Sequence, residues 1–313
     1  MSSHQDLPVT ENIVMTDTTM PSQFSTAAIQ MNSQQDIDSN LANIKAAIID
    51  AKSQGAELVV VPENCCSMGQ QFATAERFDA LSATMAEYAR THNIYLLAGS
   101  LPCPYRPDGM VVPDGRLRQV SQLFAPDGTR VARYDKIHLF TATVADKQGS
   151  YNEAATFEPG TQTVVAPLES EGAVYQLGMM VCFDLRFPAL AQRLRQSGAD
   201  ILSAPSAFTY LTGQAHWSLL LQARALDSQC MVIGAAQGGD HAYKDGNTRQ
   251  TWGHTTITAF DGSVIASHDS SELNLSTTSD IDKGYAIVMA SLDKQAQVQG
   301  RQKLPIFDCH RLA

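Results

Sequence analysis

Short apolar runs separated by amphipathic stretches recur along most of the chain. Leu41, Ile44, Ile48 and Ile49 follow helical spacing, which predicts a helix that packs through one apolar stripe. Strands that alternate with helices indicate a layered α/β fold. Further helices are predicted over residues 80–91, 189–196 and 216–228. Buried strands are predicted at the apolar runs 27–31, 58–61, 94–98, 175–181, 200–203, 230–235 and 286–292.

Turn residues between the apolar runs add antiparallel elements and loops. Residues 125–128 (Ala-Pro-Asp-Gly) join predicted strands 120–124 and 131–134, which is typical of a hairpin. Asp261 and Gly262 join residues 255–260 to 263–266 in the same way. Mixed sheets are therefore expected. Loops are predicted at residues 102–116, 141–160, 238–247 and 269–282.

The N-terminal residues differ in character from the rest of the chain. Residues 1–24 are polar, rich in Ser, Thr, Asp and Gln, and show no period, which predicts a flexible extension. From residue 25 to residue 313 no linker and no internal repeat divides the sequence. With 44% hydrophobic residues, a chain of 313 residues can bury a large core as one domain.

Charge and composition restrict the partners that the protein is expected to bind and the compartment in which it is expected. The formal net charge is −10, from 22 basic and 32 acidic residues, which argues against binding of nucleic acid or an anionic membrane. No apolar stretch reaches the roughly 18 residues that a membrane span needs, and the first residues lack the pattern of a signal peptide. Six irregularly spaced cysteines argue against a disulfide framework and favour a reducing, cytoplasmic location.

Cys182 stands where an apolar run ends and shortly before Pro188 opens a helical stretch. Proline is well tolerated in the first turn of a helix. A thiol at a strand-to-helix junction lies near backbone N–H groups and the positive end of a helix dipole, and both favour the reactive thiolate. The alternative interpretation is that Cys182 is a small buried hydrophobic residue.

Two charged residues also lie at the ends of apolar runs. Glu63 follows the run 58–61, and Lys136 has apolar neighbours on its C-terminal side. Together with Cys182 they could form a site in which the carboxylate takes the thiol proton. The ammonium would then stabilise negative charge on a reacting carbonyl oxygen. We therefore predict Glu63, Lys136 and Cys182 as catalytic residues.

Three motifs around these residues resemble those of the nitrilase (carbon–nitrogen hydrolase) superfamily. They are the segments 60–64 (VVPEN), 133–139 (RYDKIHL) and 181–188 (VCFDLRFP). A second glutamate that helps to position the site in this family matches Glu153, which is followed by Ala154 where the family often has serine. The resemblance covers about residues 25–313. It implies one carbon–nitrogen hydrolase domain, an α-β-β-α four-layer sandwich with mixed sheets, which usually forms a homodimer.

Further segments resemble one branch of the superfamily. Residues 205–208 (PSAF), 212–217 (TGQAHW) and 304–311 are similar to the deaminated glutathione amidases, although Gln214 and Gln119 replace a usual proline and asparagine. The ω-amidases, which act on 2-oxoglutaramate and 2-oxosuccinamate, share the second segment and are the alternative. Carbamoylases and nitrilases fit less well, because residues 212–217 resemble the amidase branches.

The resemblance implies an amidase that hydrolyses the amide bond of a small 2-oxo acid amide through a thioester on Cys182. Deaminated glutathione is the leading substrate, in a metabolite-repair role. Lys136 and the backbone N–H of Phe183 are expected to hold the oxyanion. Arg186, Phe208 and Thr212 are expected to bind the substrate, Arg186 through a carboxylate. A structural salt bridge for Arg186 and a core position for Phe208 are the alternatives.

Other classes of function find less support in the sequence. No cofactor and no metal are expected, because no His-x-x-x-His or Cys-x-x-Cys spacing occurs. The motifs of serine hydrolases, nucleotide hydrolases and dinucleotide-binding proteins are missing as well. A non-catalytic scaffold on this fold would have lost one of the three predicted catalytic residues, and all three are present. The expected partners are a small amide with a carboxylate and a second copy of the chain.

Overall fold

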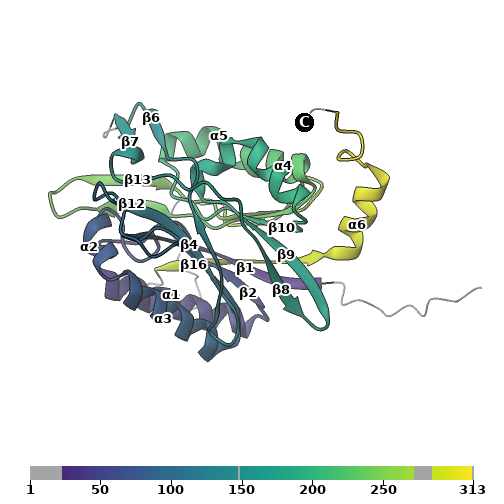
Figure 1. The fold of residues 1–313 in the computed structure, drawn as a ribbon, viewed down its shortest axis with the longest axis horizontal. Coiled ribbons are helices and arrows are strands. Elements are labelled where there is room, and N and C mark those ends of the chain that lie inside the picture. Colours follow the sequence, from purple (N-terminus) through teal and green to yellow (C-terminus); the bar gives the residue numbers. More distant parts are fainter. Residues whose placement is uncertain (1–22, 147–148, 271–283, 312–313) are drawn as a thin grey trace, which may run out of the picture.

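Two six-stranded sheets stack face to face, and helices cover the outer face of each sheet (Figure 1). The computed structural model describes residues 23–146, 149–270 and 284–311. Both sheets combine parallel with antiparallel pairs. The predicted α-β-β-α four-layer sandwich with mixed sheets is confirmed.

The first sheet places the segment that leads to Glu63 at its centre. Its parallel pairs are β1 with β2 and β2 with β3, and its other pairs are antiparallel. Because β2 has a neighbouring strand on each side, the residues that follow it lie near the middle of the edge where the strands end. In spatial order the strands are β16 (Tyr285–Asp293), β1 (Gln23–Met31), β2 (Leu58–Val60), β3 (Tyr95–Cys103), β4 (Arg118–Phe124) and β5 (Arg130–Asp135).

The second sheet repeats this plan and leads to Cys182. Strands β9, β10 and β11 are parallel neighbours, and the outer pairs are antiparallel. Cys182 follows the parallel strand β9, as Glu63 follows β2. In spatial order the strands are β15 (Val264–Ser267), β14 (Thr256–Thr258), β11 (Met231–Gly234), β10 (Ile201–Ser203), β9 (Ala173–Met179) and β8 (Val165–Ser170).

Helices α1 (Ile37–Ser53) and α3 (Phe78–His92) cover the first sheet, and α4 (Pro188–Gln196) and α5 (Tyr210–Ser228) cover the second, on opposite sides of the view in Figure 1. The carboxylate of Asp36 caps α1 by accepting a hydrogen bond from the Ser39 N–H (2.7 Å). Two shorter helices are α2 (Gln71–Glu76) and α6 (Lys294–Lys303).

Strand alternation divides the core into two layers. In β1, Ala27 and Ile29 face the cluster under α1 and α3, whereas Phe24 and Ala28 face the second sheet. Phe24 stacks on Tyr175 of β9 with ring centres 4.8 Å apart. Gln23 and Phe24 therefore belong to β1, and their assignment to the N-terminal extension was wrong. The rest of that extension lies outside the described residues.

The predicted apolar stripe of α1 is partly right. Ile44 and Ile48 are buried, but Ile49 is 45% exposed. Ala47 and Ala51 occupy the buried positions beside them, because they lie three or four residues along the helix from Ile44 and Ile48.

Three loop and helix boundaries differ from the sequence predictions, and a fourth prediction is mostly outside the described residues. Strand β3 continues through Pro102 and Cys103, which pair with β4. Helix α5 begins at Tyr210 rather than at His216, after the N-cap Thr209. Residues 141–160 contain the short hairpin β6 (Thr141–Thr143) and β7 (Ser150–Asn152), followed by the 3₁₀ helix η1 (Glu153–Ala155). Most of the predicted loop 269–282 lies outside the described residues.

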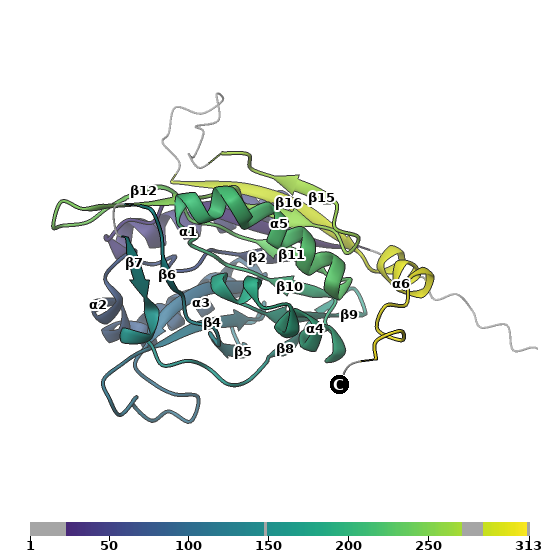
Figure 2. The ribbon, with the colours of Figure 1, turned by 90° about the horizontal axis from the view of Figure 1, so that it is seen from above.

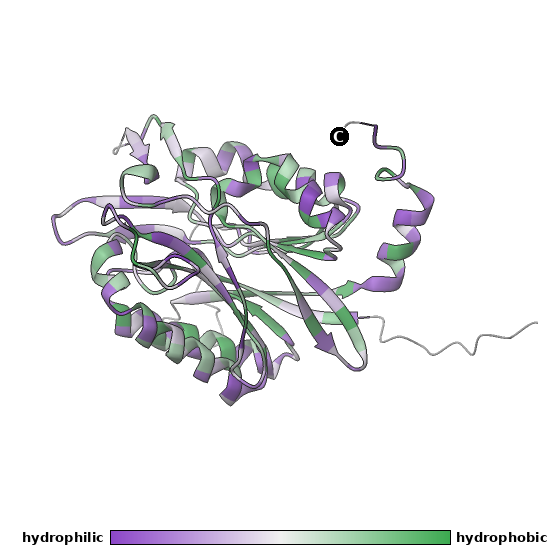
Figure 3. Ribbon diagram, in the orientation of Figure 1, coloured by the Kyte–Doolittle hydropathy of each residue, from purple (hydrophilic) through white to green (hydrophobic). Residues whose placement is uncertain are grey.

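The glycine-rich segment 238–247, which the sequence predicted as a loop, forms half of a hairpin. Strand β12 (Gly238–Ala242) pairs with β13 (Thr248–Trp252). This hairpin and the β6–β7 hairpin lie at the same end of the sandwich in both views (Figures 1 and 2). Figure 3 shows that hydrophilic residues dominate the β12–β13 hairpin and α6.

No helix in the described part of the chain is long and apolar enough to cross a membrane.

Candidate active site

Glu63 lies three residues beyond the end of β2, in a segment held by β3 and by the residues that follow β11. Its backbone forms a bridge with Ser100, and its carbonyl oxygen accepts a hydrogen bond from the Gln237 side chain (3.0 Å). The following residue, Asn64, has φ 55°, so the chain turns sharply after the carboxylate. The Glu63 side chain is almost fully buried, at 3% exposure.

Lys136 follows β5 directly and is the most deeply buried ammonium near this turn, at 1% exposure. Its Nζ donates to Glu63 Oε1 (2.8 Å) and to Glu153 Oε1 (2.9 Å). Glu153 opens η1, and its second oxygen accepts a hydrogen bond from the Phe140 N–H (2.6 Å). One ammonium therefore joins two carboxylates from separate loops.

Cys182 completes the cluster from the second sheet. It begins the 3₁₀ helix η2 (Cys182–Arg186) with φ 51°, a left-handed conformation that side chains rarely adopt. Its N–H donates to Pro205 O (3.0 Å), which fixes this turn, and the thiol hydrogen-bonds with Glu63. The structure thus brings Glu63, Lys136, Glu153 and Cys182 together, although they are far apart in sequence.

The charges of this cluster favour a protonated thiol next to an ionised acid. Burial alone would raise the pKa of Glu63, but the Lys136 ammonium outweighs burial and lowers it. Burial also disfavours charge on Lys136, yet the two carboxylates raise its pKa well above the usual range. For Glu153 the effect of burial prevails and raises its pKa.

The charged cluster opposes a resting thiolate at Cys182, although the start of the helical turn favours one. Burial, and then the negative charge of Glu63, raise the pKa of Cys182 well above its usual range, although Lys136 opposes them. The thiolate would be a third negative charge beside a single ammonium. A proton must therefore leave Cys182 during attack, and Glu63 is hydrogen-bonded to receive it.

Asp184 is a residue of this site that the sequence analysis missed. It is fully buried, and its Oδ2 accepts hydrogen bonds from the Val181 N–H (2.9 Å) and the Tyr134 hydroxyl (2.7 Å). Its Oδ1 accepts from the His138 backbone N–H (3.1 Å) and lies 2.8 Å from His138 Nδ1. Asp184 therefore ties the cysteine turn to the segment that carries Lys136. A carboxylate two residues after the nucleophile, in an apolar surrounding, was the available signal.

Glu63 and Lys136 are each held by a further main-chain contact, and a glutamine side chain connects their two segments. The Ala207 N–H donates to Glu63 Oε2 (3.0 Å). Gln119 accepts from the Lys136 N–H through its carbonyl oxygen (2.9 Å), and its side chain donates to Asn64 Oδ1 (2.9 Å). Gln119, which departs from the usual asparagine, thus connects the segments of the acid and the ammonium.

Two of the three predicted substrate-binding residues, Arg186 and Phe208, contact each other. The Arg186 guanidinium lies 5.3 Å from the ring centre of Phe208 and 5.9 Å from that of Phe183. It also contacts His216 Nδ1 (3.3 Å). Phe208 is buried and packs edge-on against Trp217, so it belongs to the core as well.

Thr212 lies in the first turn of α5. Its hydroxyl is 2.7 Å from the hydroxyl of Thr209 and also contacts the Thr209 carbonyl oxygen (3.3 Å). In this arrangement Thr212 supports the start of the helix, and a role in substrate binding stays a prediction.

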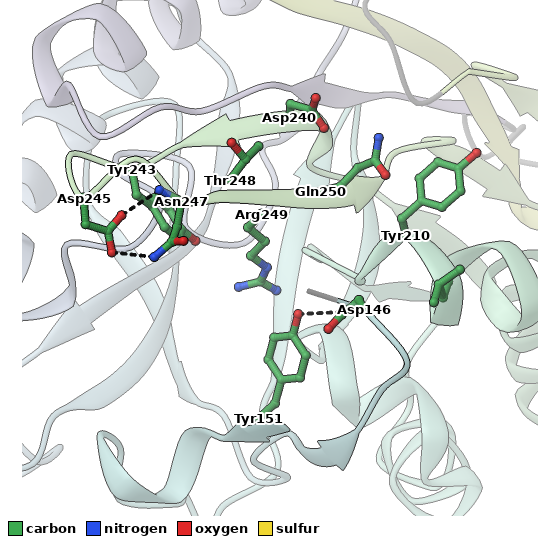
Figure 4. A pocket seen from close by; sticks show the side chains of 11 residues that line it. Asp146, Tyr151, Tyr210, Asp240, Tyr243, Asp245, Asn247, Thr248, Arg249 and Gln250 are labelled. Atoms are coloured by element: carbon green, nitrogen blue, oxygen red, sulfur yellow. Dashed lines mark hydrogen bonds between the residues drawn. The ribbon is translucent and has the colours of Figure 1, made fainter. Parts of the chain in front are cut away.

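A cavity of about 730 Å³ lies between two hairpins and α5 (Figure 4), and Glu63, Lys136, Glu153 and Cys182 are not among its lining residues. Three segments line it, namely the β6–β7 hairpin, the start of α5 and the β12–β13 hairpin. Arg249 of β13 points into the space above Tyr151. Its Nη2 donates to Ala207 O (2.8 Å), so Arg249 and Glu63 bind opposite ends of the same residue. The sequence analysis missed Arg249, because a single arginine in a polar hairpin gives no signal.

A buried histidine fixes the hairpin that carries Arg249. His241 donates through Nδ1 to Ser33 O (2.7 Å), and its Nε2 accepts from the Thr251 hydroxyl (2.6 Å), which requires the neutral ring. Burial lowers the pKa of His241 from 6.5 to about 4. Because the unfolded state takes up the proton first, this residue favours unfolding as pH falls from 6.5 towards 4.

We expect His241 to make folding sensitive to mild acid. Protonation of the unfolded state should reduce the free energy of unfolding by about 3 kcal/mol between pH 7 and pH 4. In His241→Gln the amide can form the same two hydrogen bonds but does not titrate, so its stability should fall less over this range. Urea unfolding of both proteins at pH 7, 5.5 and 4.5 measures the difference. Identical pH slopes for the two proteins would contradict this prediction.

Within the described residues, no group of three or more His, Cys, Asp or Glu side chains is placed to hold a metal ion.

Comparison with known proteins agrees with this geometry. The family model for carbon-nitrogen hydrolase matches residues 25–289. The deaminated glutathione amidase of Yersinia enterocolitica is 39% identical over 244 residues, which are 76% of this chain and 80% of the relative. The deaminated glutathione amidase of a Synechocystis strain is 35% identical over 92% of this chain and 98% of its own. Omega-amidase NIT2 of Homo sapiens is 32% identical over 91% of this chain and 94% of its own.

Solved structures extend the comparison to the fold. The crystal structure of the C. elegans NitFhit protein superposes with a TM-score of 0.76 at 30% identity and covers 93% of this chain, which spans 65% of that longer protein. A carbon-nitrogen hydrolase from Helicobacter pylori shares the fold, with a TM-score of 0.75 at 18% identity. From the family match and these relatives, the chain belongs to the carbon-nitrogen hydrolase family.

Proposed function

We propose that the protein is a cysteine amidase that hydrolyses the amide bond of a small 2-oxo acid amide, with deaminated glutathione as its substrate. The observation that carries the proposal is the buried cluster in which Lys136 Nζ lies 2.8 Å from Glu63 Oε1 while Glu63 hydrogen-bonds with the Cys182 thiol. A nucleophile, a base and a cation in direct contact are the parts that acyl transfer requires.

In the first half-reaction, Glu63 takes the thiol proton while the sulfur of Cys182 attacks the amide carbonyl carbon. The carbonyl π electrons move to oxygen, and Lys136 and the Phe183 N–H hold this oxyanion. The start of a helix leaves such N–H groups without an intrahelical acceptor. Each well-placed donor is worth about 3–4 kcal/mol. When the C–N bond breaks, Glu63 returns its proton to the departing amine, and a thioester remains.

In the second half-reaction, water hydrolyses the thioester. Glu63 takes a proton from the water, and the resulting hydroxide attacks the thioester carbonyl carbon. The C–S bond breaks, the sulfur regains its proton from Glu63, and the free acid leaves. The sum is one amide and one water converted into one acid and one amine.

Glu153 acts through Lys136 in this proposal. Its carboxylate accepts from Lys136 Nζ (2.9 Å), which holds the ammonium between the two acids and keeps it charged. Glu153 is therefore a positioning residue. A substrate carboxylate on the acyl side would bind Arg186, whose guanidinium is stacked near Phe208 and Phe183 and is only partly exposed.

The relatives support deaminated glutathione over the alternative substrates. Two proteins named deaminated glutathione amidase are 39% and 35% identical to this chain, and a protein named omega-amidase is 32% identical. ω-Amidase activity on 2-oxoglutaramate is the second candidate, because the two classes share residues 212–217.

We expect kcat/KM for deaminated glutathione to exceed that for 2-oxoglutaramate by tenfold or more. Both substrates present the same 2-oxo acid to Arg186, but only the larger one is long enough to extend from Glu63 into the cavity of about 730 Å³ that Arg249 lines. Steady-state rates measured side by side on one enzyme preparation decide the question. A tenfold preference for 2-oxoglutaramate would assign the protein to the ω-amidases. Hydrolysis of a simple nitrile or an N-carbamoyl amino acid in preference to both amides would exclude an amidase role.

A cytoplasmic homodimer is the assembly we propose. Leu219 and Leu226 are 68% and 53% exposed on α5, and Val264 and Ile265 of β15 are exposed near the same region, where Leu226 lies beside Gly262. Such a surface supports association with a second copy through α5. Light scattering coupled to size exclusion measures the mass of the assembly.

A further inference from the structure

The cavity that Arg249 lines, which Ala207 connects to Glu63, is larger than a primary amide needs. Its volume of about 730 Å³ lies within the range of roughly 300–1,000 Å³ that small-molecule sites occupy. If the departing group were only ammonia, this space would stay filled with water during the reaction. The residues that line it therefore indicate which chemical groups the departing amine carries.

Arg249 supplies the positive charge of this cavity. Among the lining residues that the structure describes, it is the only cationic side chain. Its Nη2 donates to Ala207 O (2.8 Å), and its Cζ lies 5.7 Å from the ring centre of Tyr151. Its Nε is buried, with no hydrogen-bond partner in the described part of the chain. Because Nε is closed to the cavity, a ligand oxygen would bind the terminal nitrogens of the guanidinium, which Figure 4 shows extending into the space.

Three carboxylates, those of Asp146, Asp240 and Asp245, also line the cavity, and loop donors hold two of them. Asp146 accepts hydrogen bonds from the Tyr151 hydroxyl (2.7 Å) and the Gly149 N–H (2.9 Å). Asp245 accepts from the backbone and side chain of Asn247, as Figure 4 shows. These contacts stabilise the two hairpins around Arg249 and orient their carboxylate oxygens towards loop donors.

The position of Arg249 assigns it to the departing amine rather than to the acyl group. Glu63 must lie next to the scissile nitrogen, since it protonates that nitrogen. The Ala207 N–H binds Glu63 Oε2 (3.0 Å), and the carbonyl of the same residue binds Arg249. The acyl group lies instead on the sulfur, near Arg186, which follows Cys182 in the same 3₁₀ helix.

We infer that Arg249 binds a carboxylate on the departing amine, so that the site selects peptide-like amides over primary amides. The inference rests on the proposed function. In deaminated glutathione the departing amine is cysteinylglycine, whose carboxylate lies about 7 Å from the scissile nitrogen when the dipeptide is extended. The substrate would then carry one carboxylate at each end, with Arg186 at the acyl end and Arg249 at the amine end.

The test compares three substrates that share the 2-oxo acyl group. The first is deaminated glutathione, the second is its analogue with a C-terminal carboxamide, and the third is 2-oxoglutaramate. The wild-type protein should hydrolyse the first at least tenfold more efficiently than the second in kcat/KM, chiefly through KM. In Arg249→Gln this ratio should fall to within about twofold of unity. Arg249 also supports Ala207, so its replacement could reduce activity on every substrate. The rate on 2-oxoglutaramate, which has no carboxylate on its departing group, measures this general loss of activity.

Lys244→Gln is the matched control. Lys244 is exposed on the same hairpin, and its replacement removes the same charge from outside the cavity. This variant should keep the wild-type ratio between carboxylate and carboxamide. Equal losses on all three substrates in Arg249→Gln would overturn the inference, since they would show that Arg249 only supports Ala207.

A binding measurement separates this inference from the proposed function. Calorimetric titration with cysteinylglycine under reducing conditions should detect binding to the wild-type protein and at least tenfold weaker binding to Arg249→Gln. If the wild-type protein hydrolyses none of the three substrates, the proposed function is wrong, and this titration still decides the role of Arg249. Equal affinity of the two proteins for cysteinylglycine would reject that role.

Discussion

Replacement of Cys182 by alanine is expected to abolish hydrolysis, with a loss in kcat on the order of 10⁴-fold or more. The sulfur is the only group in the proposed mechanism that forms a bond to the substrate carbon. Without it, Glu63 could still activate water, but the oxyanion donors are arranged around an acyl group on Cys182. Steady-state rates on deaminated glutathione measure the loss.

Cys66→Ala is the control for this prediction. Cys66 is also buried, three residues from Glu63, and its hydrogen bond with the neighbouring Cys65, and then burial, raise its pKa well above the usual range. Its replacement should change kcat by less than about threefold. Hydroxylamine gives a second measurement, because it should trap the thioester as a hydroxamate in the Cys66 variant and not in the Cys182 variant. Residual activity of Cys182→Ala within tenfold of wild type would contradict a thioester mechanism.

The three main site residues could be predicted because each follows a strand. Apolar runs mark buried strands, and polar residues directly after them lie at a sheet edge. Sequence alone could not show that the ends of β2, β5 and β9 meet, since strand pairing depends on contacts between distant residues. The resemblance to a known family supplied that step for Glu63, Lys136 and Cys182.

Elements without an apolar pattern were missed. The β12–β13 hairpin carries polar residues even on its buried face, where His241 and Thr251 lie, so it shows no apolar alternation, and Arg249 was missed with it. In α6 only Gln297 is buried, which leaves no apolar stripe to detect. The start of α5 at Tyr210 was missed because Thr209, Thr212 and Gly213 are typical of loops, whereas here Gly213 packs tightly against Trp252.

The resting state of Cys182 shows how burial overrides local geometry. The helix start and its N–H groups favour a thiolate, which was one reason to predict Cys182 as the nucleophile. The sequence could not reveal that Glu63 and Glu153 both lie near Lys136, so that a thiolate would face an excess of negative charge. The ion cluster therefore makes Glu63 the base and leaves the sulfur protonated until attack.

Replacement of Lys136 by methionine is expected to destabilise the fold and to reduce activity together. It would leave the carboxylates of Glu63 and Glu153 buried near each other without their shared ammonium. Removing one partner from a buried ion cluster typically costs about 3–5 kcal/mol. The loss of one oxyanion donor should reduce kcat by a further factor of about 10²–10³. Urea unfolding and steady-state rates at pH 7 measure the two effects separately.

The pH dependence and a double variant test the cause of this destabilisation. In the wild-type protein the pKa of Glu63 is lowered, so its contribution to stability is present at neutral pH and is lost as pH falls. In Lys136→Met the paired carboxylates should instead raise the pKa of one of them, so the folded state binds more protons than the unfolded state. The variant should therefore recover stability between pH 7 and pH 5. Lys136→Met combined with Glu153→Gln should regain stability at pH 7 but not activity, because one buried charge is removed while the oxyanion still lacks its ammonium. If the double variant is no more stable than Lys136→Met, repulsion between the two acids is not the cause.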